Sequence, residues 1–189
     1  MDRALDSYIV KHSNFLTLDI CNKTIDELKD TKWKQNVFYD PKSNSTRTLS
    51  GDLENDYSFD EKITTNKIIM DKLWGVIDDY IKKLEFDWFV GWQGYTTLRY
   101  NKYSENKKMA EHCDHINSIF DGERKGVPIL SIVGILNDDY EGGDFAMFKN
   151  KKIDLKQGDL LLFPSSFLYP HRVDPVTKGH RYSYVSWVY

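Results

Sequence analysis

The sequence Gly158-Asp159-Leu160-Leu161-Leu162-Phe163-Pro164 is followed, four residues later, by Tyr169-Pro170-His171-Arg172-Val173. Each stretch is a short run of apolar or β-branched residues with glycine or proline beside it, which is typical of a strand bounded by turns. The second stretch also places a histidine at the start of its strand. We therefore predict two consecutive strands here, and runs of the same kind fill the sequence after Phe86.

Such repeated short runs favour a β-sandwich or a β-barrel. Turn residues at Asn150, Gln157-Gly158 and Lys178-Gly179 separate several of them. The strands that we predict are Tyr95–Tyr100, Met109–Asp114, Ile129–Leu136, Gly143–Phe148, Lys152–Leu155, Asp159–Phe163, Tyr169–Val173 and Arg181–Val188.

The sequence before Phe86 has a different pattern. The helical spacing of Ile20, Ile25, Leu28 and Trp33 predicts a helix over Asp19–Gln35, with Asp19 or Asn22 as its cap. A stronger helix that packs on a sheet is predicted over Thr64–Leu84. The polar stretch Asp40–Asp60 predicts a long loop or short irregular strands. The apolar stripe of the stronger helix is Ile68, Ile69, Leu73, Trp74, Ile77, Tyr80, Ile81 and Leu84.

These elements predict a mainly β fold with flanking α-helices: a double-stranded β-helix (jelly-roll) core with the N-terminal helices packed on it. At 189 residues the chain suits one domain. We expect residues 1–90 to form a helical and loop support region, and residues 91–189 to form the jelly-roll core that carries the functional site.

Composition limits the classes of partner. A hydrophobic content of 40%, with 12 Tyr, 10 Phe and only 5 Pro, argues against disorder, and a net charge of −3 argues against binding to nucleic acid. No stretch approaches the roughly 20 apolar residues of a membrane span, and no signal peptide is visible. The two cysteines, Cys21 and Cys113, are expected to be free thiols. We therefore expect a cytoplasmic protein without a membrane partner.

The motif His112-Cys113-Asp114 predicts a metal site. On a strand, His112 and Asp114 leave the same face, whereas Cys113 and His115 point the other way. A third ligand must come from another strand, and His171 is the candidate that a neighbouring strand of a jelly roll could bring opposite His112. Two imidazoles and one carboxylate on one octahedral face leave three open positions, which is the ligand set of non-haem Fe(II) oxygenases.

A buried cation would define the class further. Arg181 lies ten positions after His171, on the predicted final strand, and an arginine can bind both oxygens of a carboxylate at once. It therefore suits the distal carboxylate of a dicarboxylate whose keto-acid end chelates iron. Ser183 shares its face of the strand and can donate a hydroxyl group.

From about Tyr100 onward, the sequence resembles the prolyl 4-hydroxylase-like branch of the Fe(II)/2-oxoglutarate oxygenases. The matching blocks occur in the order of the family: Tyr103, His112-Cys113-Asp114, Leu136–Phe145, Gly158–Pro164, His171-Arg172-Val173 with Pro175-Val176, and Gly179–Ser183 with Trp187. The resemblance implies that His112, Asp114 and His171 bind iron and that Arg181 binds 2-oxoglutarate. It also places Ser131 at a hydroxyl position near that carboxylate.

Three positions depart from the family pattern. Met109 stands where an aromatic residue usually bonds to 2-oxoglutarate, so that bond must come from elsewhere, with Tyr103 and Ser131 as the candidates. Asn106 replaces a common glycine, and asparagine also tolerates the left-handed conformation. Pro128 stands where the family often has a basic residue.

The resemblance implies an oxygenase that uses Fe(II), 2-oxoglutarate and O₂, with ascorbate as an optional addition, and that releases succinate and CO₂. It points to a prolyl residue in a protein or peptide as the substrate, with a free amino acid or another small molecule as the runner-up. Arg47, Arg99 and Arg124 are the arginines left to bind a free carboxylate. The oligomeric state stays open.

Other interpretations compete with this one. A non-catalytic jelly-roll module could keep the site for recognition alone, and a zinc hydrolase could use the same three ligands but would leave Arg181 without a role. We interpret Cys113 as a small buried residue, Trp187 as a core residue that can also reach the pocket, and Gly142-Gly143 as a tight turn between strands.

Overall fold

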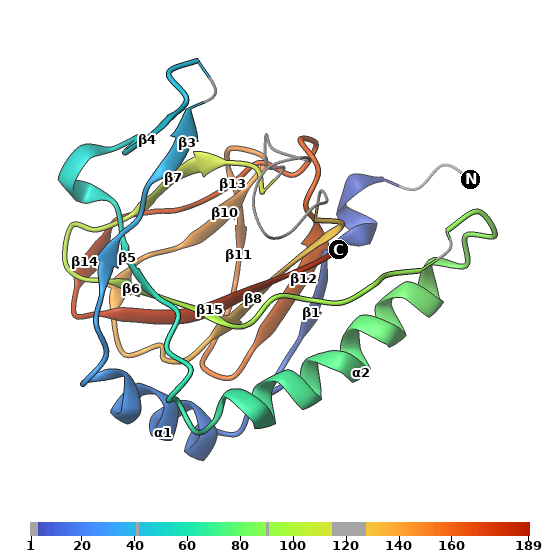
Figure 1. Ribbon diagram of the computed structural model, residues 1–189, viewed down its shortest axis with the longest axis horizontal. Coiled ribbons are helices and arrows are strands. Elements are labelled where there is room, and N and C mark those ends of the chain that lie inside the picture. Colours follow the sequence, from blue (N-terminus) through green and yellow to red (C-terminus); the bar gives the residue numbers. More distant parts are fainter. Residues whose placement is uncertain (1–3, 41, 90, 115–127) are drawn as a thin grey trace.

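The computed structural model describes residues 4–40, 42–89, 91–114 and 128–189. Two antiparallel sheets face each other, and two helices cover the outer face of the larger sheet (Figure 1). This is the predicted jelly roll with helices packed on it. No helix among these residues is long and apolar enough to cross a lipid bilayer.

The larger sheet has seven strands, and its central strand is the last one in the sequence. Every neighbouring pair is antiparallel. In spatial order the strands are β1 (Val10–His12), β12 (Leu160–Pro164), β8 (Leu130–Ile135), β15 (Arg181–Val188), β6 (Arg99–Tyr103), β5 (Asp56–Ser58) and β2 (Lys34–Gln35).

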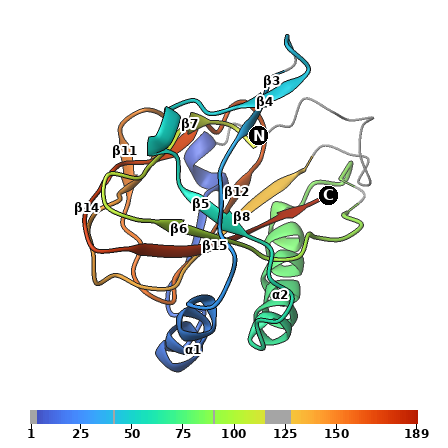
Figure 2. The ribbon, with the colours of Figure 1, turned by 60° about the vertical axis from the view of Figure 1, so that its left-hand side comes forward.

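The smaller sheet has four strands, and two short two-stranded sheets complete the β structure among the described residues. The smaller sheet has the order β11 (Lys151–Ile153), β10 (Phe145–Met147), β13 (His171–Val173) and β7 (Met109–His112). The pairs are β9 (Glu141–Gly142) with β14 (Val176–Lys178), and β3 (Phe38–Asp40) with β4 (Ser45–Arg47), which projects from the sheets in Figure 2. Short 3₁₀ helices span Leu5–Tyr8 and Gly51–Leu53.

Alternation along β15 and β6 divides the larger sheet into two faces. Tyr100 and Tyr184 point outward and join the hydrophobic cluster beneath the helices, whereas Arg181 and Ser183 point inward, toward the smaller sheet. Gly134 makes room for the outward face, because an added Cβ atom there would lie 2.0 Å from the Tyr184 ring.

The two helices lie side by side against this outward face. Helix α2 (Asn66–Leu84) agrees with the predicted helix, and it ends at Glu85, which adopts the left-handed conformation. Its buried side chains are Ile69, Leu73, Ile77 and Tyr80. Two residues of the predicted stripe, Ile68 and Trp74, are 44% and 57% exposed, so the buried face is narrower than predicted.

Helix α1 (Leu18–Leu28) is shorter than predicted, and its cap is different. The side chain of Thr17 accepts a hydrogen bond from the amide of Ile20, so the predicted caps Asp19 and Asn22 lie inside the helix. Trp33 had extended the apolar pattern to Gln35, but it lies beyond the helix, where its ring packs 6.2 Å from that of Tyr182.

Seven of the eight predicted strands agree with observed ones to within a few residues. The first was placed too early: β6 begins at Arg99, and Tyr95 forms only an isolated bridge with Val188. The predicted division at residue 90 is also too sharp, because β1, β2 and β5 come from the first half of the chain and complete the larger sheet.

The turn at Gly142-Gly143 is a tight one, as predicted. Both glycines have positive φ, and a Cβ atom on Gly142 would lie 2.5 Å from the Pro175 carbonyl oxygen. Asn106 also has a positive φ of 66°, so it keeps the turn in which the related family commonly has glycine.

Candidate metal centre and cavity

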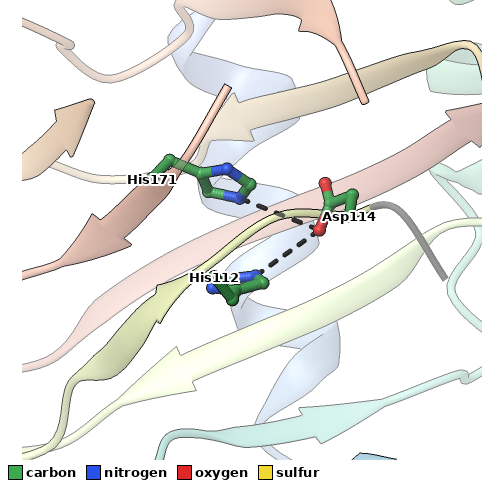
Figure 3. Close-up of side chains that lie close together, drawn as sticks. All are labelled: His112, Asp114 and His171. Atoms are coloured by element: carbon green, nitrogen blue, oxygen red, sulfur yellow. Dashed lines mark ion pairs between the residues drawn. The ribbon is translucent and has the colours of Figure 1, made fainter. Parts of the chain in front are cut away.

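Three side chains converge between the two sheets. His112 lies at the end of β7, His171 begins β13, and the two residues are directly paired across the antiparallel ladder. Asp114 Oδ1 lies 3.4 Å from His112 Nε2 and 3.8 Å from His171 Nε2 (Figure 3). One ligand atom from each residue lies within 4.8 Å of the other two, so a single metal ion can contact all three. The predicted opposition of His171 and His112 is confirmed.

Asp114 reaches this point from a bend, whereas the sequence predicted a strand. Strand β7 ends at His112, two residues before Asp114. Beyond the strand the chain bends at Asp114, and Figure 3 shows its carboxylate facing both imidazoles. His115, which was weighed as a competing ligand, lies outside the described residues.

Both histidines are oriented by the backbone. His112 Nδ1 lies 2.8 Å from the carbonyl oxygen of Ala110, and His171 Nδ1 lies 3.1 Å from that of Tyr169. Because a carbonyl oxygen can only accept, each Nδ1 carries a proton, and the neutral form of each ring then presents a lone pair at Nε2. Both lone pairs are therefore available to a metal ion.

The charges of the ligands suit metal binding as well. Burial lowers the pKa of His171 to about 4, against the attraction of Asp114, so this imidazole is neutral at neutral pH. Burial would raise the pKa of Asp114, but His171, His112 and the Ser131 hydroxyl together bring it below its ordinary value. Neutral imidazoles and an ionised carboxylate are the forms that bind a divalent metal.

Ser131 supports the carboxylate. Its hydroxyl donates to Asp114 Oδ2 at 2.6 Å and lies 2.8 Å from the hydroxyl of Ser165. One carboxylate oxygen is thereby held by a serine while the other faces the histidines. The sequence predicted that Ser131 contributes to the 2-oxoglutarate site; that role stays a prediction, and the contact present here is with a metal ligand.

A cavity of about 270 Å³ opens beside the three ligands. Arg181 lines this cavity, is 1% exposed, and forms no ion pair with any described carboxylate. Its Nη1 donates to Ser183 Oγ at 3.0 Å, and its Nε is buried without a hydrogen-bond partner. A buried guanidinium with an unused donor fits an anionic ligand, because leaving it unpaired is costly.

Tyr103 completes the surroundings of Arg181. The guanidinium lies 5.0 Å from the centre of the Tyr103 ring, and both side chains line the cavity. Burial raises the pKa of Tyr103, so the phenol keeps its proton and can donate a hydrogen bond. The structure thus brings together Tyr103, Arg181 and Ser183, which the sequence assigned to the co-substrate site.

Two parts of the cavity wall escaped the sequence analysis. Arg99 was named only as one of three remaining arginines, yet it lines the cavity. The alternation of Arg99, Asn101 and Tyr103 along β6 is the signal that could have placed it. The other part comprises Asn36, Val37 and Phe38, whose sequence carries no comparable signal.

Several minor predictions can be placed as well. Met109 and Trp187 line the cavity, the latter being half-buried rather than fully in the core. Cys113 also contributes to the wall, and its thiol donates to the Phe167 carbonyl oxygen at 3.5 Å. His180 is exposed, as expected of an ordinary polar residue.

Comparison with known protein families agrees with this geometry. Residues 98–189 match the sequence model of the 2OG-Fe(II) oxygenase superfamily. The chain is 34% identical over 91 residues to a PKHD-type hydroxylase of Idiomarina loihiensis, covering 47% of this chain and 39% of that protein. It is 35% identical over 98 residues to a PKHD-type hydroxylase of Synechococcus elongatus, covering 49% and 42%. The match thus spans about two fifths of the length of these relatives.

Solved structures share the fold over nearly the whole chain. A viral collagen prolyl hydroxylase from Paramecium Bursaria Chlorella virus-1, solved as a 2OG complex, has a TM-score of 0.67 and 15% identity, with 98% of both chains covered. A prolyl hydroxylase from Trichoplax adhaerens, solved with a hypoxia inducible factor peptide fragment, has a TM-score of 0.69 and 19% identity, covering 96% of this chain and 83% of that one. At this identity the likeness establishes the double-stranded β-helix fold.

Proposed function

The chain belongs to the 2OG-Fe(II) oxygenase superfamily, and on this premise we propose that it is a hydroxylase that uses Fe(II), 2-oxoglutarate and O₂. One observation carries the proposal. A cluster of three metal ligands and a buried guanidinium without a carboxylate partner among the described residues line the same cavity. A metal site alone would fit several functions, whereas a metal site beside a free buried cation fits a metal-chelating dicarboxylate.

His112, Asp114 and His171 hold the iron in this proposal. They are fixed before the metal arrives, because the imidazoles are bonded to backbone carbonyls and the carboxylate to Ser131. Preorganised ligands of this kind favour binding. Three protein ligands also leave coordination positions free for a bidentate co-substrate and O₂.

Arg181, Ser183 and Tyr103 bind the distal carboxylate of 2-oxoglutarate. The guanidinium supplies the charge and its unpartnered Nε a donor, while the two hydroxyl groups can add hydrogen bonds. The protein surrounds these groups with apolar side chains, among them Val133, Phe145 and Val173, which limit access of water to the reacting centre.

Iron and 2-oxoglutarate held by these residues would supply the oxidising chemistry: one atom of O₂ would enter a substrate C–H bond and the other would enter succinate, with release of CO₂. The side chains of the protein bind and orient these reactants. None of them has to act as a nucleophile or general base, because the bound iron and 2-oxoglutarate would supply the oxidising chemistry.

For the substrate we propose a prolyl residue in an extended peptide. Support comes from the shared fold with prolyl hydroxylases, one of them solved with a peptide fragment. The hairpin β3–β4 adds to it: Phe38 lines the cavity, and its ring lies 5.2 Å from that of His112. A hairpin rooted at the metal ligands can close over a bound strand of peptide. The second predicted flanking segment, Asn117–Gly126, lies outside the described residues.

We further propose that residues 1–189 work as one domain. Strands β1, β2 and β5 of the first half extend the sheet that holds Arg181, and Asn36–Phe38 form part of the cavity wall. Residues 1–90 thus contribute to the site as well as supporting it.

Loss of any metal ligand tests the activity. We expect His112→Ala, Asp114→Ala and His171→Ala each to lower succinate formation more than about a hundredfold, because two remaining ligands hold iron poorly. Bound iron and succinate are measured together, with folding followed by circular dichroism. His180→Ala, which removes an exposed histidine, is the control and should keep both. Full activity in a ligand variant would remove that residue from the site, and wild-type protein that binds iron without forming succinate would favour a non-catalytic module.

The substrate is tested separately by stimulation of 2-oxoglutarate turnover. Proline-containing peptides should raise succinate release well above the level with free L-proline, and mass spectrometry should place the added oxygen on the prolyl ring. Stimulation by free amino acids with inert peptides would instead support the small-molecule alternative.

A further inference from the structure

The cavity holds a second guanidinium that the proposed iron and co-substrate chemistry does not use. Arg99 lies on β6, four residues before Tyr103, and the alternation of the strand turns both side chains to the same face. It lines the same cavity as His112 and Asp114. Among the described residues, no carboxylate lies within ion-pair distance of it.

Neighbouring side chains hold Arg99 in position. Its Nη2 donates to Asn36 Oδ1 at 2.6 Å, and its guanidinium lies 4.3 Å from the centre of the Tyr57 ring. Asn36 is itself buried and anchored, since its backbone N–H donates to the backbone carbonyl oxygen of Asn55 at 2.8 Å. The guanidinium is therefore fixed through neutral groups, which leave its charge uncompensated.

Arg99 keeps donors free for a ligand. A guanidinium has five N–H groups, and its Nε is buried without a hydrogen-bond partner. Burial lowers the pKa of Arg99, against opposing effects of Tyr103, Tyr57 and Asp114, so the surroundings disfavour the unpaired charge. An anion bound in the cavity would remove this penalty.

The charges of the cavity indicate that the anion bound by Arg99 is a different molecule from 2-oxoglutarate. In the proposed complex, the two positive charges of Fe(II) and that of Arg181 are matched by Asp114 and the dianionic co-substrate. Arg99 then remains as the unmatched positive charge of the cavity wall among the described residues. The group that matches it must arrive with the primary substrate.

We propose that Arg99 binds a carboxylate of the primary substrate and thereby positions the carbon to be hydroxylated beside the metal. This inference rests on the proposed function and deepens it. The carboxylate can belong to a free amino acid, to the C-terminus of a peptide, or to an acidic side chain near the target residue. All three present the same planar group to a guanidinium that is held in place.

The test compares matched acids and amides on protein loaded with Mn(II), which replaces Fe(II), and with 2-oxoglutarate under anoxic conditions. Isothermal titration measures the binding of L-proline against L-prolinamide, extended to the other amino acids and their amides. Prolyl peptides with a C-terminal acid are compared with C-terminal amides, and peptides with Asp or Glu beside proline are compared with Asn or Gln. The kind of pair in which the acid binds more tightly than its amide identifies the source of the carboxylate.

Wild-type protein should bind the acid of at least one pair about tenfold or more tightly than its amide, since a charge-assisted bond is replaced by a neutral one. Arg99→Gln should abolish that preference, and Arg99→Lys should keep part of it. Lys67→Gln, which removes an exposed positive charge from helix α2, is the control and should leave it intact. A merely structural Arg99 would change stability but would not distinguish acid from amide.

The proposal would be overturned if the wild-type protein bound no acid more tightly than its amide. It would also be overturned if none of these compounds bound at all. Loss of 2-oxoglutarate binding in Arg99→Gln would overturn it as well, because Arg99 would then serve the co-substrate. Failure of the proposed function is a separate result: wild-type protein would not take up Mn(II) and 2-oxoglutarate in the loading step. The measured loading distinguishes the two failures.

Discussion

The two faces of the larger sheet use the same strands for opposite purposes. On the outward face, Tyr100 and Tyr184 pack against helices α1 and α2 in a continuous hydrophobic cluster. On the inward face, the neighbouring residues Arg99, Arg181 and Ser183 present charge and hydroxyl groups to a cavity. Adjacent residues of one strand therefore have different roles: one packs beneath the helices, and the next lines the cavity.

The two faces differ in what they contribute to the stability of the fold. The outward face buries apolar groups that gain from leaving water. The inward face buries two guanidinium groups whose Nε atoms lack hydrogen-bond partners, which lowers stability until ligands arrive. Variants of the inward face should thus change binding, and variants of the outward face should change stability.

The largest effect is expected at Arg181. Arg181→Ala should raise the KM for 2-oxoglutarate about a hundredfold or more, because truncation leaves a buried carboxylate unpaired at about 3–5 kcal/mol. Arg181→Lys should do less harm, since it keeps the charge but loses the two-pronged contact. Initial rates of succinate formation against 2-oxoglutarate concentration measure both. An unchanged KM in the alanine variant would mean that another residue binds this carboxylate.

The outward face should respond at Leu73, which is fully buried on α2. Leu73→Ala should lower the free energy of unfolding by about 2–5 kcal/mol, because it leaves a cavity beneath the helix. Gly75→Ala on the exposed side of the same helix is the control and should raise it by about 0.4–1 kcal/mol, since its Cβ meets open space. Denaturant unfolding measures both. A change in iron affinity per folded molecule at Leu73 would show that the two faces are coupled.

A smaller effect is expected where Ser131 supports the metal. Ser131→Ala should weaken iron binding about 10–100-fold, the usual range for residues that orient a metal ligand. Ser183→Ala is the matched serine variant; it should weaken 2-oxoglutarate binding and spare the iron. Anoxic metal titrations of both proteins give the comparison. Equal iron affinities in Ser131→Ala and wild-type protein would show that Asp114 needs no such support.

The sequence was sufficient to predict the cluster of three candidate metal ligands, because such a cluster depends on residue type and local spacing. His112 and Asp114 are two residues apart, and His171 and Arg181 lie in sequence blocks that occur in the same order as in the family that the chain resembles. The structure pairs His171 directly with His112. The main strands were also predictable, since their apolar runs are bounded by turn residues.

What the sequence could not provide depends on contacts between distant segments. Asn36 holds Arg99 across the sheet, and nothing local to either residue indicates the pairing. Trp33 looked like a continuation of helix α1 because its spacing suited one, but it is partly buried and packs against Tyr182 from the other end of the chain. The spacing of apolar residues predicts that a residue packs in the interior, but it does not predict which element packs against it.

The central position of β15 has a consequence for how the protein is made. This strand lies between β8 and β6, which meet only through it, yet residues 181–188 follow every other strand in the sequence. During synthesis, β6 and β8 therefore emerge from the ribosome with unpaired edges and wait for the strand that joins them. The same late segment brings Arg181, so the nascent chain acquires the strand that joins the two edges together with its buried cation.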